Sequence, residues 1–191
     1  MTRWLNETEQ RAWRAYLEVI RLLLPRLDRQ LTRDSGLTMA DYEILVRLSE
    51  AQDRRMRMSE MSARTLMSRS RLSHQIGRME AQGLVRRETC ADDRRGSYAV
   101  LTDQGMAVLE AAAPGHAEAV LSSFFDGLDP AQVEGLAGAF TAMVDHLTAT
   151  SDQADDVACR TWGRNDGPDL CPGAAPEDAG NSAASKDLAA G

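Results

Sequence analysis

The chain has 191 residues, a formal net charge of −7 and an aromatic content of 5%. This length suits one domain with a tail, and apolar content rich in Leu, Ala and Met favours helices over a β-sandwich. No apolar run approaches the roughly 20 residues that span a bilayer, and residues 1–7 lack a signal-peptide core. We therefore expect a cytoplasmic protein. The three cysteines are odd in number and widely spaced, which predicts no disulfide framework.

The first predicted helix covers residues 7–31. Its apolar residues recur at alternating steps of four and three, the spacing of a heptad-like stripe: Trp13, Leu17, Ile20, Leu24, Leu27 and Leu31. Pro25 inside this pattern predicts a kink. Thr38, with an acidic residue three positions later, predicts the N-cap of a second helix over 39–51. Residues 52–57 are then expected to form a polar, basic link.

Two short helices with a turn between them are predicted next. Ser59 is expected to cap a helix over 60–66, and Ser68 to cap a second helix over 69–82 that Gly83 ends. The buried stripe of the second helix is Leu72, Ile76 and Met79. Its other faces carry Ser70, Arg71, Ser73, His74, Gln75 and Arg78. This pattern is typical of a helix-turn-helix that reads DNA.

A β-hairpin with a basic tip follows, with strands predicted at 84–90 and 97–102 around the turn A-D-D-R-R-G. Residues 54–95 hold 11 Arg and five acidic residues, whereas residues 96–147 hold seven acidic residues and no Lys or Arg. Because DNA affinity depends on local neutralisation of phosphates, this basic block supports DNA binding despite the acidic total. A reading helix followed by such a hairpin predicts a winged helix-turn-helix.

The last two predicted helices cover residues 103–126 and residues 130–148. The first of them is capped by Thr102, and Pro114–Gly115 within it is expected to bend it. The second of them carries another apolar stripe: Val133, Leu136 or Ala137, Phe140, Met143 or Val144, and Leu147. Together with the first stripe it favours a dimer interface, while an intramolecular bundle stays open as the alternative. Residues 149–191 are acidic and poor in large apolar residues, which predicts a disordered tail.

This order of elements resembles the MarR family of bacterial transcriptional regulators over about residues 10–147. The wing, D-R-R-G-S-Y-A-V-L-T-D-Q-G, is similar to the family's Asp-x-Arg…Leu-Thr-x-x-Gly signature, with Asp93, Arg95, Leu101, Thr102 and Gly105 in those places. Leu66 departs from the turn glycine of many helix-turn-helix proteins. The resemblance implies a mainly α fold with a small β-wing, in which residues 1–148 join a DNA-binding core at 38–102 to N- and C-terminal dimerisation helices.

The resemblance also implies a homodimer that binds a palindromic operator, a repressor whose binding a small-molecule effector relieves. The residues expected to contact bases and phosphates are Ser68, Ser70, Arg71, Ser73 and His74, with Arg94 and Arg95 on the wing near the minor groove. The residues expected to line an effector pocket between the dimer helices and the winged domain are Trp13, Tyr16, Tyr42 and Arg47. No cofactor is implied.

Several alternatives stay open from the sequence. The arginines of the 52–57 link are either solvated or close to the DNA backbone. Cys90 is interpreted as a small buried hydrophobe rather than a redox sensor, and the histidines lack the clustering of a metal site. Catalytic motifs are missing, which argues against an enzyme. The remaining functional alternatives are a protein-interaction adaptor, an activator or a redox-responsive regulator.

Overall fold

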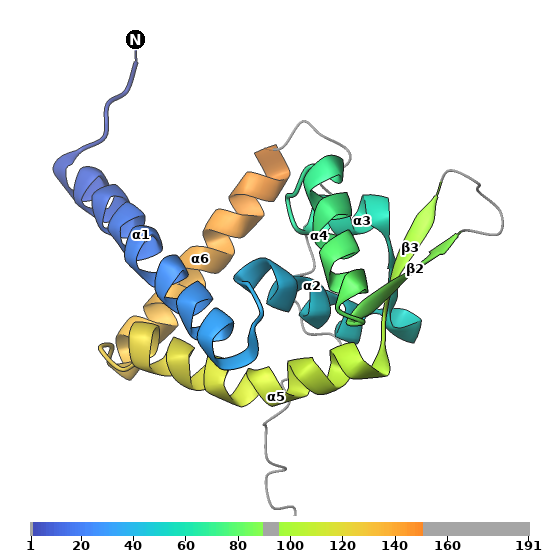
Figure 1. Cartoon of the computed structure of the whole chain (residues 1–191). Helices are drawn as coiled ribbons and strands as arrows, with labels where there is room; N and C mark the ends of the chain where they lie inside the picture. Colours follow the sequence, from blue (N-terminus) through green and yellow to red (C-terminus); the bar gives the residue numbers. More distant parts are fainter. Residues whose placement is uncertain (1, 90–95, 151–191) are drawn as a thin grey trace, which may run out of the picture.

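The computed structural model describes residues 2–89 and 96–150 and is mainly helical, as predicted (Figure 1). Its helices are α1 (Glu7–Ser35), α2 (Met39–Glu50), α3 (Met58–Arg64), α4 (Arg69–Ala81), α5 (Asp103–Val120) and α6 (Pro130–Thr150). A 3₁₀ turn covers Gln52–Arg54, and a π-helical turn covers Leu121–Phe125. The strands are β1 (Arg55–Arg57), β2 (Val85–Thr89) and β3 (Ser97–Leu101).

The sheet has three antiparallel strands in the order β1-β3-β2. Strands β2 and β3 form the predicted hairpin, in which Val85 pairs with Leu101 and Thr89 with Ser97. Strand β1 corrects the prediction of an irregular link at 52–57, because Met56 is buried against β3 while its two arginine neighbours are exposed. The sequence could not reveal this strand, because three residues with a single apolar side chain do not show an alternating pattern.

The helix starts follow local capping signals. Thr38 caps α2 through a capping box with Asp41, Ser68 caps α4, and Thr102 caps α5, all as predicted. The predicted cap at Ser59 is wrong, because α3 begins at Met58 directly after the extended Arg57. A strand that leads straight into a helix leaves no room for a separate capping residue.

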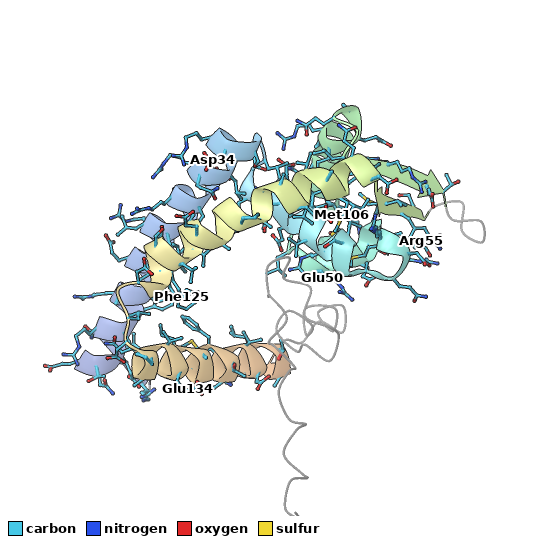
Figure 2. The ribbon with its side chains drawn as sticks, turned by 90° about the horizontal axis from the view of Figure 1, so that it is seen from below. Asp34, Glu50, Arg55, Met106, Phe125 and Glu134 are labelled. Carbon is cyan, nitrogen blue, oxygen red and sulfur yellow. The ribbon has the colours of Figure 1, made fainter. Side chains whose placement is uncertain are left out.

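Neither internal proline ends its helix. Helix α1 continues through Pro25 to Ser35, four residues beyond the predicted end, and stops at a left-handed Gly36. Helix α5 likewise runs through Pro114 without interruption, and Figure 2 shows its ribbon as a continuous arc, which agrees with a bent rather than a straight helix. The regular helix ends at Val120, where the π-helical turn begins, rather than at residue 126. Both prolines are exposed, and each is accommodated within a helix that continues past it.

The core lies under the winged domain, where α2, α3, α4, the sheet and α5 meet. The largest fully buried side chains are Leu31, Ile44, Leu45, Leu48, Met61, Leu72, Ile76, Met79 and Val85. Helix α1 adds only its C-terminal end to this core, while Trp13, Leu17 and Leu24 remain exposed. Among the α6 residues whose side chains the structure describes, none is buried.

Gly105 fixes how closely α5 approaches the winged domain. A Cβ atom at this position would lie 2.9 Å from the Leu84 carbonyl carbon, closer still to its oxygen, and 2.8 Å from Leu101 Cδ1. Glycine is therefore required here by close packing, since its φ is not in the left-handed region.

We predict that Gly105→Ala lowers the free energy of unfolding by about 3 kcal/mol, because a backbone carbonyl cannot move aside cheaply. Urea denaturation would measure the change. The matched control is Gly135→Ala on α6, where an added Cβ would meet nothing within 4 Å and better helix propensity favours alanine. Equal stability of the Gly105 variant and the unchanged protein would contradict the packing argument.

Candidate nucleic-acid interface

Helix α4 divides cleanly into a buried and an exposed face. Leu72, Ile76 and Met79 are buried, as predicted, whereas Ser70, Arg71 and His74 are exposed. At its start the Ser68 hydroxyl accepts a hydrogen bond of 3.3 Å from the Arg71 amide. The exposed face therefore carries hydroxyl, imidazole and guanidinium groups next to the positive end of the helix dipole, a combination suited to phosphates and base edges.

Ser73, another predicted contact residue, is half-buried where strand β2 of the wing packs against α4. The Arg87 side chain on β2 donates to the Ser73 carbonyl oxygen at 2.6 Å, and the Arg87 amide donates to Glu80 Oε1 at 2.9 Å. Gly77 faces this guanidinium, and a Cβ there would make an ordinary contact with Arg87 Nη2 at 3.7 Å. Sequence reasoning missed Arg87, because its role depends on how β2 crosses α4.

The arginines of β1 are also held by the sheet. Tyr98 on β3 lies beneath both, with the Arg55 guanidinium 4.5 Å and the Arg57 guanidinium 5.5 Å from the ring centroid. Arg57 Nε also donates to the Tyr98 hydroxyl at 3.2 Å. These cation–π contacts fix two positive charges along one edge of the sheet.

The turn between α3 and α4 contains a strained residue. Leu66 has a φ of +52° and is 75% exposed, so the position that lacks the expected glycine keeps the left-handed backbone. Polar contacts hold the turn on both sides: the Thr65 hydroxyl donates to the Met61 carbonyl at 2.7 Å, and the Ser62 hydroxyl donates to the Met67 carbonyl at 2.6 Å. The turn geometry is thus maintained by its neighbours rather than by Leu66.

We expect Leu66→Gly to raise the free energy of unfolding by up to about 1 kcal/mol, because glycine adopts this φ without the Cβ clash. Leu66→Ala is the matched variant that removes the exposed side chain and keeps the strain. Chemical denaturation of both variants would separate the two effects. If the alanine variant is stabilised as much as the glycine variant, the gain in stability comes from removing the exposed side chain, and the strain argument is wrong.

The predicted effector residues fall in three places. Trp13 and Tyr16 stack on the exposed half of α1, with ring centroids 5.7 Å apart. Tyr42 on α2 packs against His116 on α5, with ring centroids 4.5 Å apart. Arg47 pairs with Glu43 at 2.8 Å and lines a cleft of about 330 Å³ bounded by α2, β1 and α3. One protomer therefore does not gather the four residues into one pocket.

His116 is placed between three helices. Its Nδ1 lies 3.2 Å from Gln30 Oε1 on α1, and its ring packs against Tyr42 on α2. Burial lowers the pKa of His116 below its ordinary value, because the charged form loses hydration. Burial therefore favours the neutral imidazole, which offers a hydrogen-bonding and stacking surface at this contact of α1, α2 and α5.

Comparisons with known proteins agree with this geometry. A model of the MarR family matches residues 35–96. The chain is 51% identical to AbsC, a MarR family transcriptional regulator from Streptomyces coelicolor, with 78% of this chain and 99% of that one covered and a TM-score of 0.71. The chain belongs to the MarR family.

Two further relatives extend the comparison. Sco3205, a MarR family regulator from Streptomyces coelicolor solved in complex with DNA, is 45% identical over 77% of this chain and 92% of that one, with a TM-score of 0.72. The transcriptional repressor YetL from Bacillus subtilis (strain 168) is 29% identical over 94 residues, which are 48% of this chain and 56% of that repressor. This MarR family chain is a transcriptional regulator and not an enzyme, as predicted.

Part of the predicted site lies outside the described residues: Arg94 and Arg95 of the wing, and with them Asp93, Cys90, Cys159 and Cys171. Within residues 2–89 and 96–150, no group of three or more His, Cys, Asp or Glu side chains is arranged to hold a metal ion. The helices in these ranges are too short or too polar to cross a membrane.

Proposed function

We propose that this MarR family regulator binds a palindromic operator as a homodimer and represses transcription until a small-molecule effector releases it. The observation that carries the DNA-binding part is the exposed face of α4, where Ser70, Arg71 and His74 project from a rigid helix capped by Ser68. That Sco3205, which is 45% identical, was solved in complex with DNA supports DNA binding by this chain. The similarity to YetL, a transcriptional repressor, supports repression as the mode of regulation.

Each contact residue has a role that follows from its chemistry. Arg71 is proposed to bind guanine O6 and N7 with two hydrogen bonds, while Ser68, Ser70 and Ser73 contact phosphates near the helix N-terminus. His74 lies one turn further along the exposed face. Arg94 and Arg95, in the turn of the hairpin, are proposed to approach the minor groove, where narrow A·T-rich sequence attracts arginine.

Arg71→Ala is expected to weaken operator binding by about 1–3 kcal/mol and to relax the preference at one symmetric base position. Competition binding against operators changed at single positions would measure both effects. Arg11→Ala removes an exposed arginine from α1 instead and is the matched control. If both variants lose affinity equally at every base, then Arg71 contributes charge and not base recognition.

The adaptor alternative predicts a different salt dependence. A MarR protein that neutralises phosphates should lose DNA affinity steeply as salt rises, and a gel-shift series over salt concentration measures this slope. A protein that used its winged domain only for docking on another protein would show neither a specific shift nor that slope. This outcome would replace the operator-binding proposal.

The proposed homodimer uses the two apolar surfaces that one protomer leaves uncovered. On α6 the side chains of Phe140, Met143, Val144 and Leu147 are exposed. The N-terminal half of α1 exposes Trp13, Leu17 and Leu24 in the same way. Figure 2 shows α6, on which Glu134 is labelled, standing apart from the winged domain. Burial of these faces against a second copy would stabilise α6, which has little apolar support of its own.

Phe140→Asp is expected to dissociate the dimer or unfold it at micromolar concentration, because an unpaired carboxylate would be buried in an apolar interface. Analytical ultracentrifugation measures the mass. Ala142→Asp places the same charge on the opposite side of α6 and serves as control. A wild-type protein that sediments as a stable folded monomer would contradict the dimer proposal, whatever the variants do.

The effector is proposed to bind where the dimer helices meet the winged domain, near the contact of Tyr42 with His116. Trp13 and Tyr16 would extend this aromatic surface if α1 of the second copy brings them nearby. CouR from Rhodococcus jostii RHA1, solved with p-coumaroyl-CoA, shares the fold at 21% identity. Residues 149–191 are proposed to be dispensable for DNA binding, since their acidic charge offers nothing to phosphates.

A further inference from the structure

A buried carboxylate lies between α2 and the reading helix α4. Asp41 is only 5% exposed, and its two oxygens have different partners. Oδ2 accepts hydrogen bonds from the Thr38 amide at 2.9 Å and the Thr38 hydroxyl at 2.6 Å, which completes the N-cap of α2. Oδ1 accepts a hydrogen bond from the Gln75 side-chain amide and lies 3.7 Å from the Arg78 guanidinium, both on α4. One side chain therefore caps one helix and holds another.

The same turn of α2 is also attached to α1. Asp28 Oδ1 on α1 accepts a hydrogen bond of 2.8 Å from the Met39 amide, the first residue of α2. The two carboxylates thus accept from two of the free amides at the start of α2, and both lie at the positive end of its dipole. Figure 1 shows α2 between α1 and α4. Polar contacts consequently run from α1 through the start of α2 to the buried side of the reading helix.

We infer that Asp41 is a positioning residue that fixes the tilt of α4 relative to α1 and so sets which operator half-site spacing the dimer accepts. The inference rests on the proposed function. Helix α4 has 13 residues and is about 20 Å long, so a tilt of about 10° moves its far end by about 3 Å. That displacement is close to one base-pair step of about 3.4 Å. A small change in this contact is therefore enough to shift the preferred spacing.

The chemistry of the contact suggests a selective pair of substitutions. Asp41→Asn keeps one oxygen for the cap but removes the negative charge that faces α4. Gln75→Glu instead places a second carboxylate against Asp41, and the like charges repel. In the double variant the introduced amide can donate to the introduced carboxylate, so the link between α2 and α4 is restored with its polarity reversed.

The experiment measures spacing preference rather than affinity alone. Full-length wild-type protein first selects a palindromic duplex from a random pool, and the duplex is then remade with its half-sites one base pair closer and one base pair further apart. The ratio of dissociation constants for altered and selected spacing is determined for each variant. This ratio cancels any uniform loss of affinity, including the repulsion of phosphate by a carboxylate on α4. A purely structural role would leave it unchanged.

We expect Gln75→Glu and Asp41→Asn each to lower the spacing ratio by roughly threefold to tenfold, because a charge-assisted hydrogen bond between α2 and α4 is lost. The double variant should bring the ratio back towards its wild-type value. Asp34→Asn, which alters an exposed ion pair with Arg33 on α1, is the control and should keep the ratio. If Asp41→Asn does not fold, Gln75→Glu decides the question alone, because it leaves the Asp41 cap of α2 unchanged.

Two outcomes would overturn the inference and are distinguishable. Wild-type spacing ratios in both single variants would mean that Asp41 only stabilises the fold, while the proposed function stands. Failure of the wild-type protein to select any duplex would instead overturn the proposed function and this inference with it. Thermal melting of every variant, recorded alongside, separates loss of folding from loss of positioning.

Discussion

Hydrogen bonds of Thr102, at the start of α5, join three parts of the chain that are separate in the sequence. The Thr102 hydroxyl donates to the Gly83 carbonyl at 2.6 Å and accepts from the Gly105 amide at 2.9 Å, while the Thr102 amide donates to the Leu84 carbonyl at 3.2 Å. The end of α4, the first residue of the wing and the first turn of α5 are therefore joined within one small set of hydrogen bonds. Because Gly105 has no side chain, α5 can lie directly on this junction, and the Leu-Thr-x-x-Gly signature has a physical explanation.

Signals that act within a few residues could be predicted from the sequence, and contacts between distant elements could not. The caps at Thr38, Ser68 and Thr102 are hydrogen bonds within one turn, so residue type and spacing were enough to place them. Strand β1 and the start of α3 were missed because Met56 is recognisable as a strand residue only once β3 lies beside it. The bridging role of Asp41 was hidden for the same reason, since its cap is local but its contact with Gln75 spans 34 positions.

The heptad stripe on α1 shows a second limit of pattern reading. The six apolar residues were correctly assigned to one face, yet that face serves two environments: Leu27 and Leu31 are buried in the protomer's own core, and Trp13, Leu17 and Leu24 are exposed. Periodicity identifies a face that avoids water but does not say what covers it. The predicted effector residues show the same limit, because the contact of Tyr42 with His116 forms only when α2 and α5 pack together.

The basic block of residues 54–95 is less positive towards its surroundings than its composition suggests. Six of its arginines lie within ion-pairing distance of a carboxylate on the same chain: Arg54, Arg55, Arg64, Arg78, Arg86 and Arg87. Cations already neutralised inside the protein do not displace the condensed ions of a duplex, so they add little to the entropy of counterion release. In the proposed complex with DNA, the number of ions set free therefore reports the few arginines on the exposed face of α4. Counting every arginine in the block would overstate how strongly the complex responds to ionic strength.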